Sequence, residues 1–149
     1  MAARWLGLEE SQNDSSDKKR NSTTVMVVEP DVLARAVLAE YLRGCGYRVL
    51  EGVNANDALA LLAAKQPVEI IFSEVHLTGG LDGFSLAKHV REKHPDIDVL
   101  LTRGVAKAAE KAGDLCEDGP LEKPYHPQDV VRRINILRER RRTTTRPLG

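Results

Sequence analysis

The sequence predicts an α/β fold: a doubly wound parallel sheet of five strands with helices on both faces. Short apolar runs alternate along the chain with longer segments whose apolar residues recur at helical spacing. Strands that alternate with helices build parallel sheets with right-handed crossovers. The chain has 149 residues, of which 42% are hydrophobic, and this suits one domain with a sizeable core.

The first half of the chain is expected to form three strands and two helices. Val25 to Val28 is a continuous apolar run, as expected for a strand that is buried on both faces. Asn54 is placed to cap a helix, with Asp57 at the third position of that helix. In chain order, we expect a strand over 25–28, a helix over 33–45, a strand over 47–50, a helix after Asn54 and a strand over 68–72.

The second half is expected to add two strands and three helices. A Gly-rich loop over 78–83 leads into a helix that contains Phe84 and Val90. The last helix is expected to begin near Pro127, with Ile134 facing inward and the arginines outward. In chain order, we expect that loop and helix, a strand over 99–101, a weakly patterned helix over 105–112, a short fifth strand around Leu121, and the last helix.

The two ends of the chain differ in composition from the part between them. We expect residues 1–23 to form a flexible arm, residues 24–140 the folded domain, and residues 141–149 a basic flexible tail. The chain has 22 Lys+Arg and 22 Asp+Glu. From Arg132 to the end there are seven arginines and one glutamate, a net charge of +6, so residues 1–131 carry −6. The neutral sum therefore conceals a polarised molecule.

Membrane, disulfide and metal-binding classes are disfavoured by the composition. No apolar run approaches the roughly 20 residues that cross a bilayer, and the N-terminus has no signal-peptide core, so we expect a soluble cytoplasmic protein without membrane contact. Cys45 and Cys116 lie far apart in the chain, and we expect two reduced thiols. The four histidines lack metal-ligand spacing.

Four blocks of the chain resemble, in order and spacing, the receiver (CheY-like) domain of two-component response regulators. They are VMVVEPDVLARAVLAEYLRGCGYRVLEGVNANDALALL, EIIFSEVHLTGGLDGFSLAKHV, DVLLTRG and PLEKPYHPQDVVRRI. The resemblance covers about residues 24–138 and implies a flavodoxin-like strand order of 2-1-3-4-5. The extra glycine of the second block and the KPYHPQDVV sequence look most like receivers found beside HWE-type histidine kinases of alphaproteobacteria.

The chemistry that this resemblance implies is aspartyl phosphorylation. A carboxylate after the third strand takes a phosphoryl group from a kinase histidine. Acidic residues after the first strand hold Mg²⁺, which neutralises the phosphoryl oxygens. A lysine that precedes a proline pairs with the phosphate, and a hydroxyl after the fourth strand donates a hydrogen bond to it.

The acceptor and the metal ligands of that chemistry are altered in this sequence. The acceptor position falls on Glu74 instead of an aspartate. The acidic pair after the first strand reads Glu29-Pro30, so proline stands in place of the main metal ligand. Asp31 is the candidate to replace part of the lost ligand set.

The remaining positions of the degenerate phosphorylation site are partly kept. The hydroxyl position falls on Arg103, with Thr102 as the alternative if the register is shifted by one residue. Lys123 and Pro124 match the family pattern, whereas the aromatic position is occupied by Pro120.

These departures predict a receiver that is not switched by ordinary aspartyl phosphorylation. The extra methylene of Glu74 moves its carboxylate by about a bond length, which disrupts in-line transfer, and the loss of a metal ligand leaves phosphoryl charge uncompensated. We therefore expect no enzymatic activity, no cofactor, and weak or absent Mg²⁺ binding. We hypothesise that Glu74 forms a fixed ion pair with Lys123 and also with Arg103; the alternative is that Glu74 points to solvent.

A stand-alone receiver is expected to act through its surface. The resemblance implies the face made by the fourth helix, the fifth strand and the fifth helix, with a histidine kinase, another receiver or a second copy as the partner. On this face we expect the partner contacts to come from Arg132, Arg133, Arg138 and Arg140. Two alternatives stay open: phosphorylation of Ser73 or Glu74, and contact of the basic tail with nucleic acid, which the low aromatic content of 4% disfavours.

Overall fold

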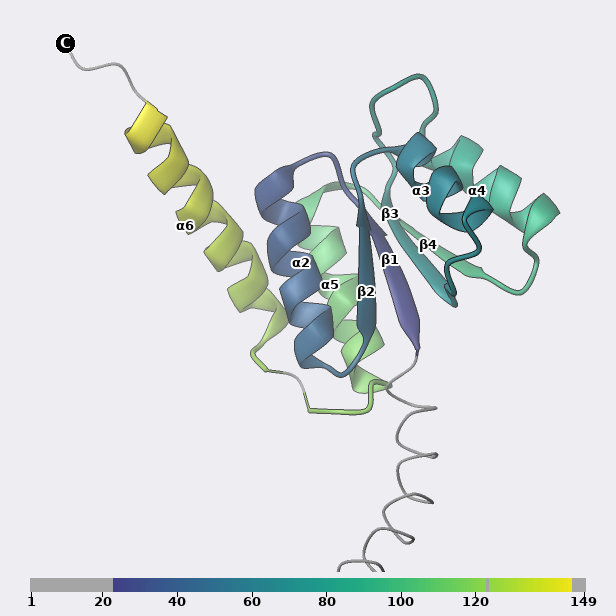
Figure 1. The fold of residues 1–149 in the computed structure, drawn as a ribbon. Coiled ribbons are helices and arrows are strands. Elements are labelled where there is room, and N and C mark those ends of the chain that lie inside the picture. The colour runs from purple at the N-terminus through teal and green to yellow at the C-terminus, as the bar shows by residue number, and fades with distance from the viewer. Residues whose placement is uncertain (1–22, 123, 146–149) are drawn as a thin grey trace, which may run out of the picture.

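The computed structural model describes residues 23–122 and 124–145 of the chain. Strands and helices alternate within these residues up to α5, in the order that the sequence predicts (Figure 1). They are β1 (Thr24–Val28), α2 (Val32–Gly44), β2 (Arg48–Gly52), α3 (Ala55–Ala63), β3 (Ile70–Glu74), α4 (Gly83–Lys93), β4 (Asp98–Thr102), α5 (Gly104–Glu117) and α6 (Pro127–Thr145).

The four strands of the described residues form one parallel sheet in the order β2-β1-β3-β4. All five residues of β1 are buried, as a strand covered by helices on both faces requires. Helices α2 and α5 lie on one face of the sheet, and α3 and α4 lie on the other (Figure 1). The predicted α/β fold with helices on both faces is therefore confirmed.

Two hydrophobic cores lie on the two faces of the sheet, because successive side chains of a strand point in opposite directions. Val25 and Val27 of β1 pack in the core that α2, α5 and α6 cover. Met26 and Val28 pack in the core beneath α3 and α4. Ile134 of α6 is fully buried in the first core, so apolar contacts attach α6 to the domain.

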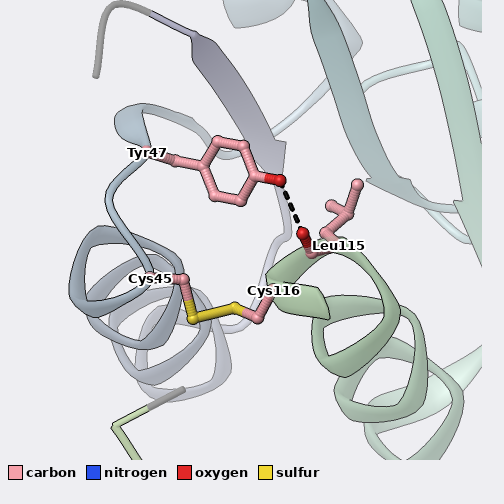
Figure 2. Close-up of a disulfide and its surroundings, with 4 residues drawn as sticks. All are labelled: Cys45, Tyr47, Leu115 and Cys116. Atoms are coloured by element: carbon pink, nitrogen blue, oxygen red, sulfur yellow. Dashed lines mark hydrogen bonds between the residues drawn. A yellow bond between two sulfur atoms is a disulfide. The ribbon is translucent and has the colours of Figure 1, made fainter. Parts of the chain in front are cut away.

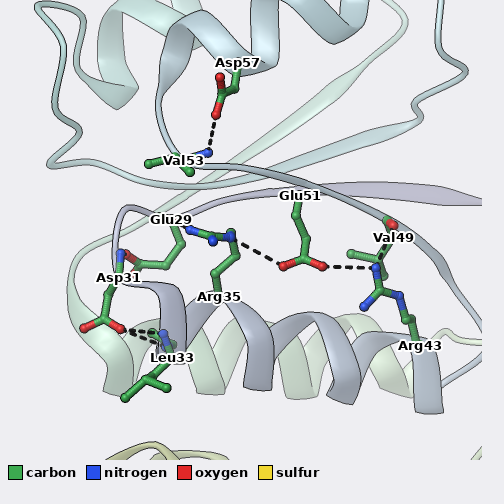
Figure 3. Close-up of polar contacts among 10 residues, drawn as sticks. Glu29, Asp31, Leu33, Arg35, Arg43, Val49, Glu51, Val53 and Asp57 are labelled. Carbon is green, nitrogen blue, oxygen red and sulfur yellow. Dashed lines mark hydrogen bonds and ion pairs between the residues drawn. The ribbon is translucent and has the colours of Figure 1, made fainter. Parts of the chain in front are cut away.

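The N-terminus of α3 is capped as predicted. The side chain of Asn54 accepts a hydrogen bond from the N–H of Asp57 at 2.9 Å. The carboxylate of Asp57 in turn accepts a hydrogen bond from the N–H of Val53 at 2.8 Å (Figure 3). The first bond satisfies an N–H group that a helix start leaves without an intrahelical partner, and the second holds the residue before the cap.

The fifth strand expected around Leu121 is not present among the described residues, so the fifth position of the expected strand order is unfilled there. The segment 118–122 lies instead against the end of α2. The N–H of Leu121 donates to the carbonyl oxygen of Cys45 at 3.1 Å. The ring of Pro120 packs on Gly46, where an added Cβ would lie 3.0 Å from the ring. Because Pro120 has no N–H to give to a sheet, this segment is better suited to a turn than to a strand.

Cys45 and Cys116 form a disulfide, so the expectation of two reduced thiols is wrong for this structure. The bond joins the residue that ends α2 to the last turn of α5, with the two Cα atoms 5.4 Å apart (Figure 2). The two cysteines are 71 residues apart in the chain. Their pairing depends on the packing of α5 on α2, which the spacing in the sequence does not show.

The C-terminal helix is longer than predicted. α6 continues to Thr145, past the expected domain boundary at residue 140, because its arginines and glutamate favour helix and continue without a break. The predicted N-terminal arm, apart from residue 23, and the last four residues of the predicted tail lie outside the described residues. No helix within the part of the chain that the structure describes is both long and apolar enough to cross a membrane.

Candidate functional site

The residues singled out in the sequence gather at the carboxyl ends of the strands. Glu29 follows β1, Glu74 ends β3 and Thr102 ends β4. The register pairs Val28 with Ser73 and Glu74 with Thr102, so these three strand ends are adjacent. Open parallel sheets carry their binding sites at this edge.

Glu29 is buried at the start of this edge. Its carboxylate accepts the N–H of Asp31 at 2.8 Å, and its carbonyl oxygen accepts the guanidinium of Arg35 at 2.8 Å (Figure 3). Burial raises the pKa of Glu29, with the N–H of Asp31 opposing and the negative charge of Glu74 adding to the rise. The backbone N–H of Asp31 therefore holds this buried carboxyl group in place.

An ion-pair network extends from Arg35, which contacts Glu29, along α2 and β2. Arg35 contacts the carboxylate of Glu51 at 3.4 Å, and Arg43 contacts the same carboxylate at 3.2 Å (Figure 3). Arg43 also donates to the carbonyl oxygen of Val49 at 3.1 Å. The network ties the helix that follows β1 to the strand beside it.

Asp31 caps α2. Its Oδ1 atom accepts the N–H groups of Leu33 and Ala34 at 2.9 and 3.0 Å, which is the preferred role of aspartate at the start of a helix. Its Oδ2 atom accepts two bonds from the guanidinium of Arg138, at 3.2 Å from Nε and 2.7 Å from the terminal nitrogen. Although burial opposes the change, the N–H of Ala34 and the charge of Arg138 lower the pKa of Asp31.

The pairing of Arg138 with Asp31 was not predicted from the sequence. The sequence predicts Arg138 on the partner face and Asp31 as a partial replacement for a lost metal ligand, and the 107 residues between them give no local sign of a contact. α6 packs beside α2 (Figure 1), and this packing brings the arginine to the helix start. Arg138 is thus a half-buried connection between α6 and the candidate site.

Glu74 is held by two backbone N–H groups. Its Oε2 atom accepts the N–H of Gly104 at 3.0 Å, and its Oε1 atom accepts the N–H of His76 at 3.4 Å. Gly104 begins α5, whose own N-cap residue makes no side-chain capping bond, so the glutamate supplies an anion where the helix dipole favours one. The two donors come from the loop after β3 and the start of α5, and they converge on one carboxylate.

The Gly-rich loop over 78–83 leads back to the end of β3, next to Glu74. Gly83 starts α4 so close to Glu74 that an added Cβ would lie 2.6 Å from the carbonyl oxygen of Glu74. Asp82 caps α4 by accepting the N–H of Ser85 at 2.8 Å. Glycine is therefore required at residue 83 for the close approach of α4 to the end of β3.

Arg103 does not pair with Glu74, contrary to the second part of the ion-pair hypothesis. Its guanidinium lies 3.0 Å from the ring nitrogen of His76 and 5.7 Å from the centre of the Phe84 ring. Contacts with the ring nitrogen of His76 and with the ring of Phe84 thus hold the arginine away from the carboxylate. Lys123, the first partner of the hypothesis, lies outside the described residues.

The two candidates for the hydroxyl position differ in burial. Thr102 is buried, and within the described residues its hydroxyl has no hydrogen-bond partner, whereas Arg103 is exposed. Pro124 follows Lys123 and packs on α2, where a Cβ added to Gly44 would meet its ring at 2.8 Å. Of the two candidates, Thr102 is therefore the one that places a hydroxyl in the interior.

The carboxylates of this corner do not fit a Mg²⁺ site. Mg²⁺ demands near-octahedral oxygen ligands, but Asp31 is committed to a helix start and an arginine, and Glu74 to two backbone N–H groups. Pro30 offers no side-chain oxygen. Within residues 23–122 and 124–145, no group of three or more histidine, cysteine or acidic side chains is placed to hold a metal ion.

The arginines of the predicted partner face lie on α6. Arg133 pairs with Glu40 of α2 at 3.0 Å, and Arg132 pairs with Asp129 at 3.6 Å. Arg138 faces Asp31 and is only 34% exposed, so it is less available to a partner than the sequence suggested. Arg132 and Arg140 are exposed on the outer face of α6.

The fold is that of an α/β domain with carboxylates at the carboxyl ends of its parallel strands. Comparison with known proteins identifies its family. Residues 25–135 match the family described as Response regulator receiver domain. The chain therefore belongs to the response regulator receiver family of two-component signalling.

Individual relatives agree with this assignment. The chain is 33% identical over 121 residues to the transcriptional regulatory protein AruR of Pseudomonas aeruginosa, covering 76% of this chain and 49% of AruR. It is 27% identical over 126 residues to the transcriptional regulatory protein ResD of Bacillus subtilis, covering 84% of this chain and 52% of ResD. This chain thus spans about half of the length of these two relatives.

A solved structure shares the fold. The receiver domain of an HD domain-containing protein from Pseudomonas fluorescens superimposes with a TM-score of 0.54 at 21% identity. The match covers 82% of this chain and 98% of that one. At this identity the likeness concerns the fold alone.

Proposed function

We propose that this receiver is a phosphorylation-independent protein-interaction module. The observation that carries the proposal is the arrangement of Glu74. Its carboxylate accepts one backbone N–H from the loop after β3 and one from the start of α5. A negatively charged group is thus built into the place where the family resemblance expects a phosphoryl group. Charge-assisted bonds from both loops favour a single loop conformation.

The chemistry of transfer is disfavoured by the same geometry. Phosphoryl transfer needs an in-line nucleophile and compensation of the charge that develops on the phosphoryl oxygens. Glu74 is already bonded through both of its oxygens, and the residues after β1 supply Pro30 and a committed Asp31 in place of free metal ligands. We therefore propose a protein without enzymatic activity and with weak or absent Mg²⁺ binding.

Ser73 is a poor alternative acceptor. It is fully buried, and its hydroxyl donates to the carbonyl oxygen of Glu74 at 2.9 Å. A phosphoryl donor would have to displace the strand to reach it. This leaves Glu74 as the acceptor to test if transfer occurs at all.

The proposed partner is a protein with an acidic surface that contacts α6. This helix carries six arginines against Asp129 and Glu139, and Ile136 exposes 46% of its surface between them, a mixture typical of protein interfaces. We propose a histidine kinase as the first candidate, of the HWE type because of the resemblance of the Gly-rich loop and the KPYHPQDVV sequence, and a cytoplasmic site of action.

Phosphorylation with a small phosphodonor tests the proposal. The full chain is incubated with acetyl phosphate and Mg²⁺, and its intact mass is measured. We expect no gain of a phosphoryl group in the wild type. The matched control is the double variant Pro30→Asp, Glu74→Asp, which restores an acceptor and a metal ligand and is expected to gain hydroxylamine-sensitive phosphorylation. Stoichiometric, hydroxylamine-sensitive phosphorylation of the wild type would overturn the proposal.

A further inference from the structure

Three carboxylates share the corner of the sheet where β1 and β3 end. Glu29 follows β1, Asp31 caps α2, and Glu74 ends β3. The pKa of Glu29 is raised chiefly by burial, and the negative charges of Glu74 and Asp31 add to the rise. A positive charge beside these groups stabilises their ionised forms, and in the receiver resemblance Mg²⁺ supplies that charge.

The guanidinium of Arg138 brings a positive charge to this corner. It donates to Oδ2 of Asp31 at 3.2 Å from Nε and at 2.7 Å from the terminal nitrogen. Its charge also opposes the rise in the pKa of Glu29, so it acts on two of the three carboxylates. The Oδ1 atom of Asp31 is bonded to the start of α2. The arginine therefore takes the oxygen of Asp31 that an external cation would need.

A second arginine at this corner is neutralised by a different partner. Arg35 donates to the carbonyl oxygen of Glu29 at 2.8 Å (Figure 3). Its guanidinium also pairs with the carboxylate of Glu51 on β2 at 3.4 Å. The charge of Arg35 is thus compensated along β2, whereas the charge of Arg138 is compensated by Asp31 at the corner itself.

Arg138 also anchors the C-terminal part of α6. Among the residues of α6 whose side chains the structure describes, it is the last that is partly buried, since residues 139–143 are exposed. The buried Ile134 lies about one helical turn earlier. α6 runs beside α2 (Figure 1). The contact of Arg138 with Asp31 therefore joins the corner to the part of α6 that carries exposed arginines.

We propose that Arg138 is an internal counter-ion that excludes divalent cations from this corner and holds the end of α6 against α2. The guanidinium occupies an oxygen of Asp31, and its charge repels a divalent cation over several ångströms. The coupling is reciprocal, so a cation that enters the corner weakens the hold on α6. This inference rests on the proposed weak or absent Mg²⁺ binding, and it assigns that weakness to a residue of α6.

Mn²⁺ binding tests the counter-ion, because Mn²⁺ favours the same oxygen ligands as Mg²⁺ and broadens the resonances of nearby amides. Mn²⁺ is titrated into the ¹⁵N-labelled full chain, and its apparent Kd is obtained from the broadening of the Asp31 and Leu33 N–H resonances. Pro30→Asp supplies a further carboxylate and should bind Mn²⁺ weakly. Addition of Arg138→Met should tighten this binding by about tenfold or more. Arg138→Lys, which keeps the charge, should tighten it less.

The matched control is Arg133→Met in the same Pro30→Asp background. Arg133 also lies on α6 but pairs with Glu40 of α2 at 3.0 Å, so its removal takes the same charge from the helix without touching Asp31. The affinity for Mn²⁺ should then change by less than about twofold, because solvent screens this exposed charge. Equal tightening by the two methionine substitutions would overturn the inference. So would the absence of Mn²⁺ binding in the Pro30→Asp, Arg138→Met variant.

Hydrogen exchange tests the link to α6. Mg²⁺ added to the Pro30→Asp variant should make the N–H groups of residues 140–142 exchange about fivefold faster, because an ion pair of this exposure holds a helix end by about that factor. With Arg138→Met, exchange should be fast with or without Mg²⁺. Unchanged exchange in Pro30→Asp when Mg²⁺ binds would overturn the link. Tight Mn²⁺ binding by the wild type would instead contradict the proposed function, so the two failures are distinguishable.

Discussion

Removal of the Arg138 guanidinium is expected to weaken the attachment of α6 to the start of α2. The guanidinium donates two hydrogen bonds to one oxygen of Asp31, at 3.2 and 2.7 Å. Arg138→Met keeps the apolar stem of the side chain and removes only these bonds. Asp31→Asn keeps a side chain that caps a helix as well as aspartate does and removes the charge.

The geometry allows the magnitude to be worked out. A hydrogen bond to a charged group is worth up to about 3 kcal/mol when it is buried, but these side chains are 34% and 37% exposed, so solvent reduces the value to about 1 kcal/mol. Each single variant should therefore lose about 1 kcal/mol of unfolding free energy, and the double variant no more than either. Asp31→Ala also loses the cap and should cost about 2 kcal/mol.

Urea denaturation of the oxidised protein and its variants measures this coupling in a double-mutant cycle. The pKa of Asp31 is lowered in the folded state, so the contribution of the carboxylate is fully present above the unfolded pKa of about 3.9. It is lost as the pH falls through the lower folded pKa. Strictly additive losses from the two substitutions at neutral pH would refute the pairing.

Three further predictions concern single residues. Burial raises the pKa of Glu29, so its contribution to stability is present at acidic pH and is lost as the pH rises through the folded pKa; urea denaturation should show Glu29→Gln gaining stability relative to the wild type over that rise. Tyr47→Phe deletes the hydrogen bond to Leu115 and should lower the unfolding free energy of the oxidised protein by about 1 kcal/mol. An unchanged unfolding free energy would contradict a stabilising role for that bond. Gly83→Ala places a methyl group 2.6 Å from a backbone oxygen of Glu74 and should cost about 1–3 kcal/mol in the same assay, whereas a neutral result would contradict the close approach.

The sheet and its helices could be predicted because local patterns determine them. The apolar run of Val25–Val28 forms a strand buried on both faces, and Asn54 caps a helix with the spacing that the sequence shows. Such signals involve residues within a few positions of one another, so they can be identified from the sequence without knowledge of the fold. The positions at the strand ends followed from the parallel topology in the same way.

The contacts that were missed join residues far apart in the chain. Cys45 and Cys116 are 71 residues apart, and Asp31 and Arg138 are 107 apart; both pairs depend on which helices pack beside α2. The strand expected around Leu121 fails for a related reason, because the backbone of this segment bonds to the end of α2 instead of to β4. A proline at residue 120 was the local signal that could have reduced the expectation of a strand.

The central claim is that the carboxylate of Glu74 already fills the place of a phosphoryl group, and site-resolved NMR tests it most directly. The amide resonances of His76 and Gly104, the two donors to Glu74, are recorded before and after addition of acetyl phosphate and Mg²⁺. We predict unchanged resonances in the wild type and clear shifts in the Pro30→Asp, Glu74→Asp variant. Shifts of both resonances in the wild type, together with the mass of an added phosphoryl group, would contradict the account.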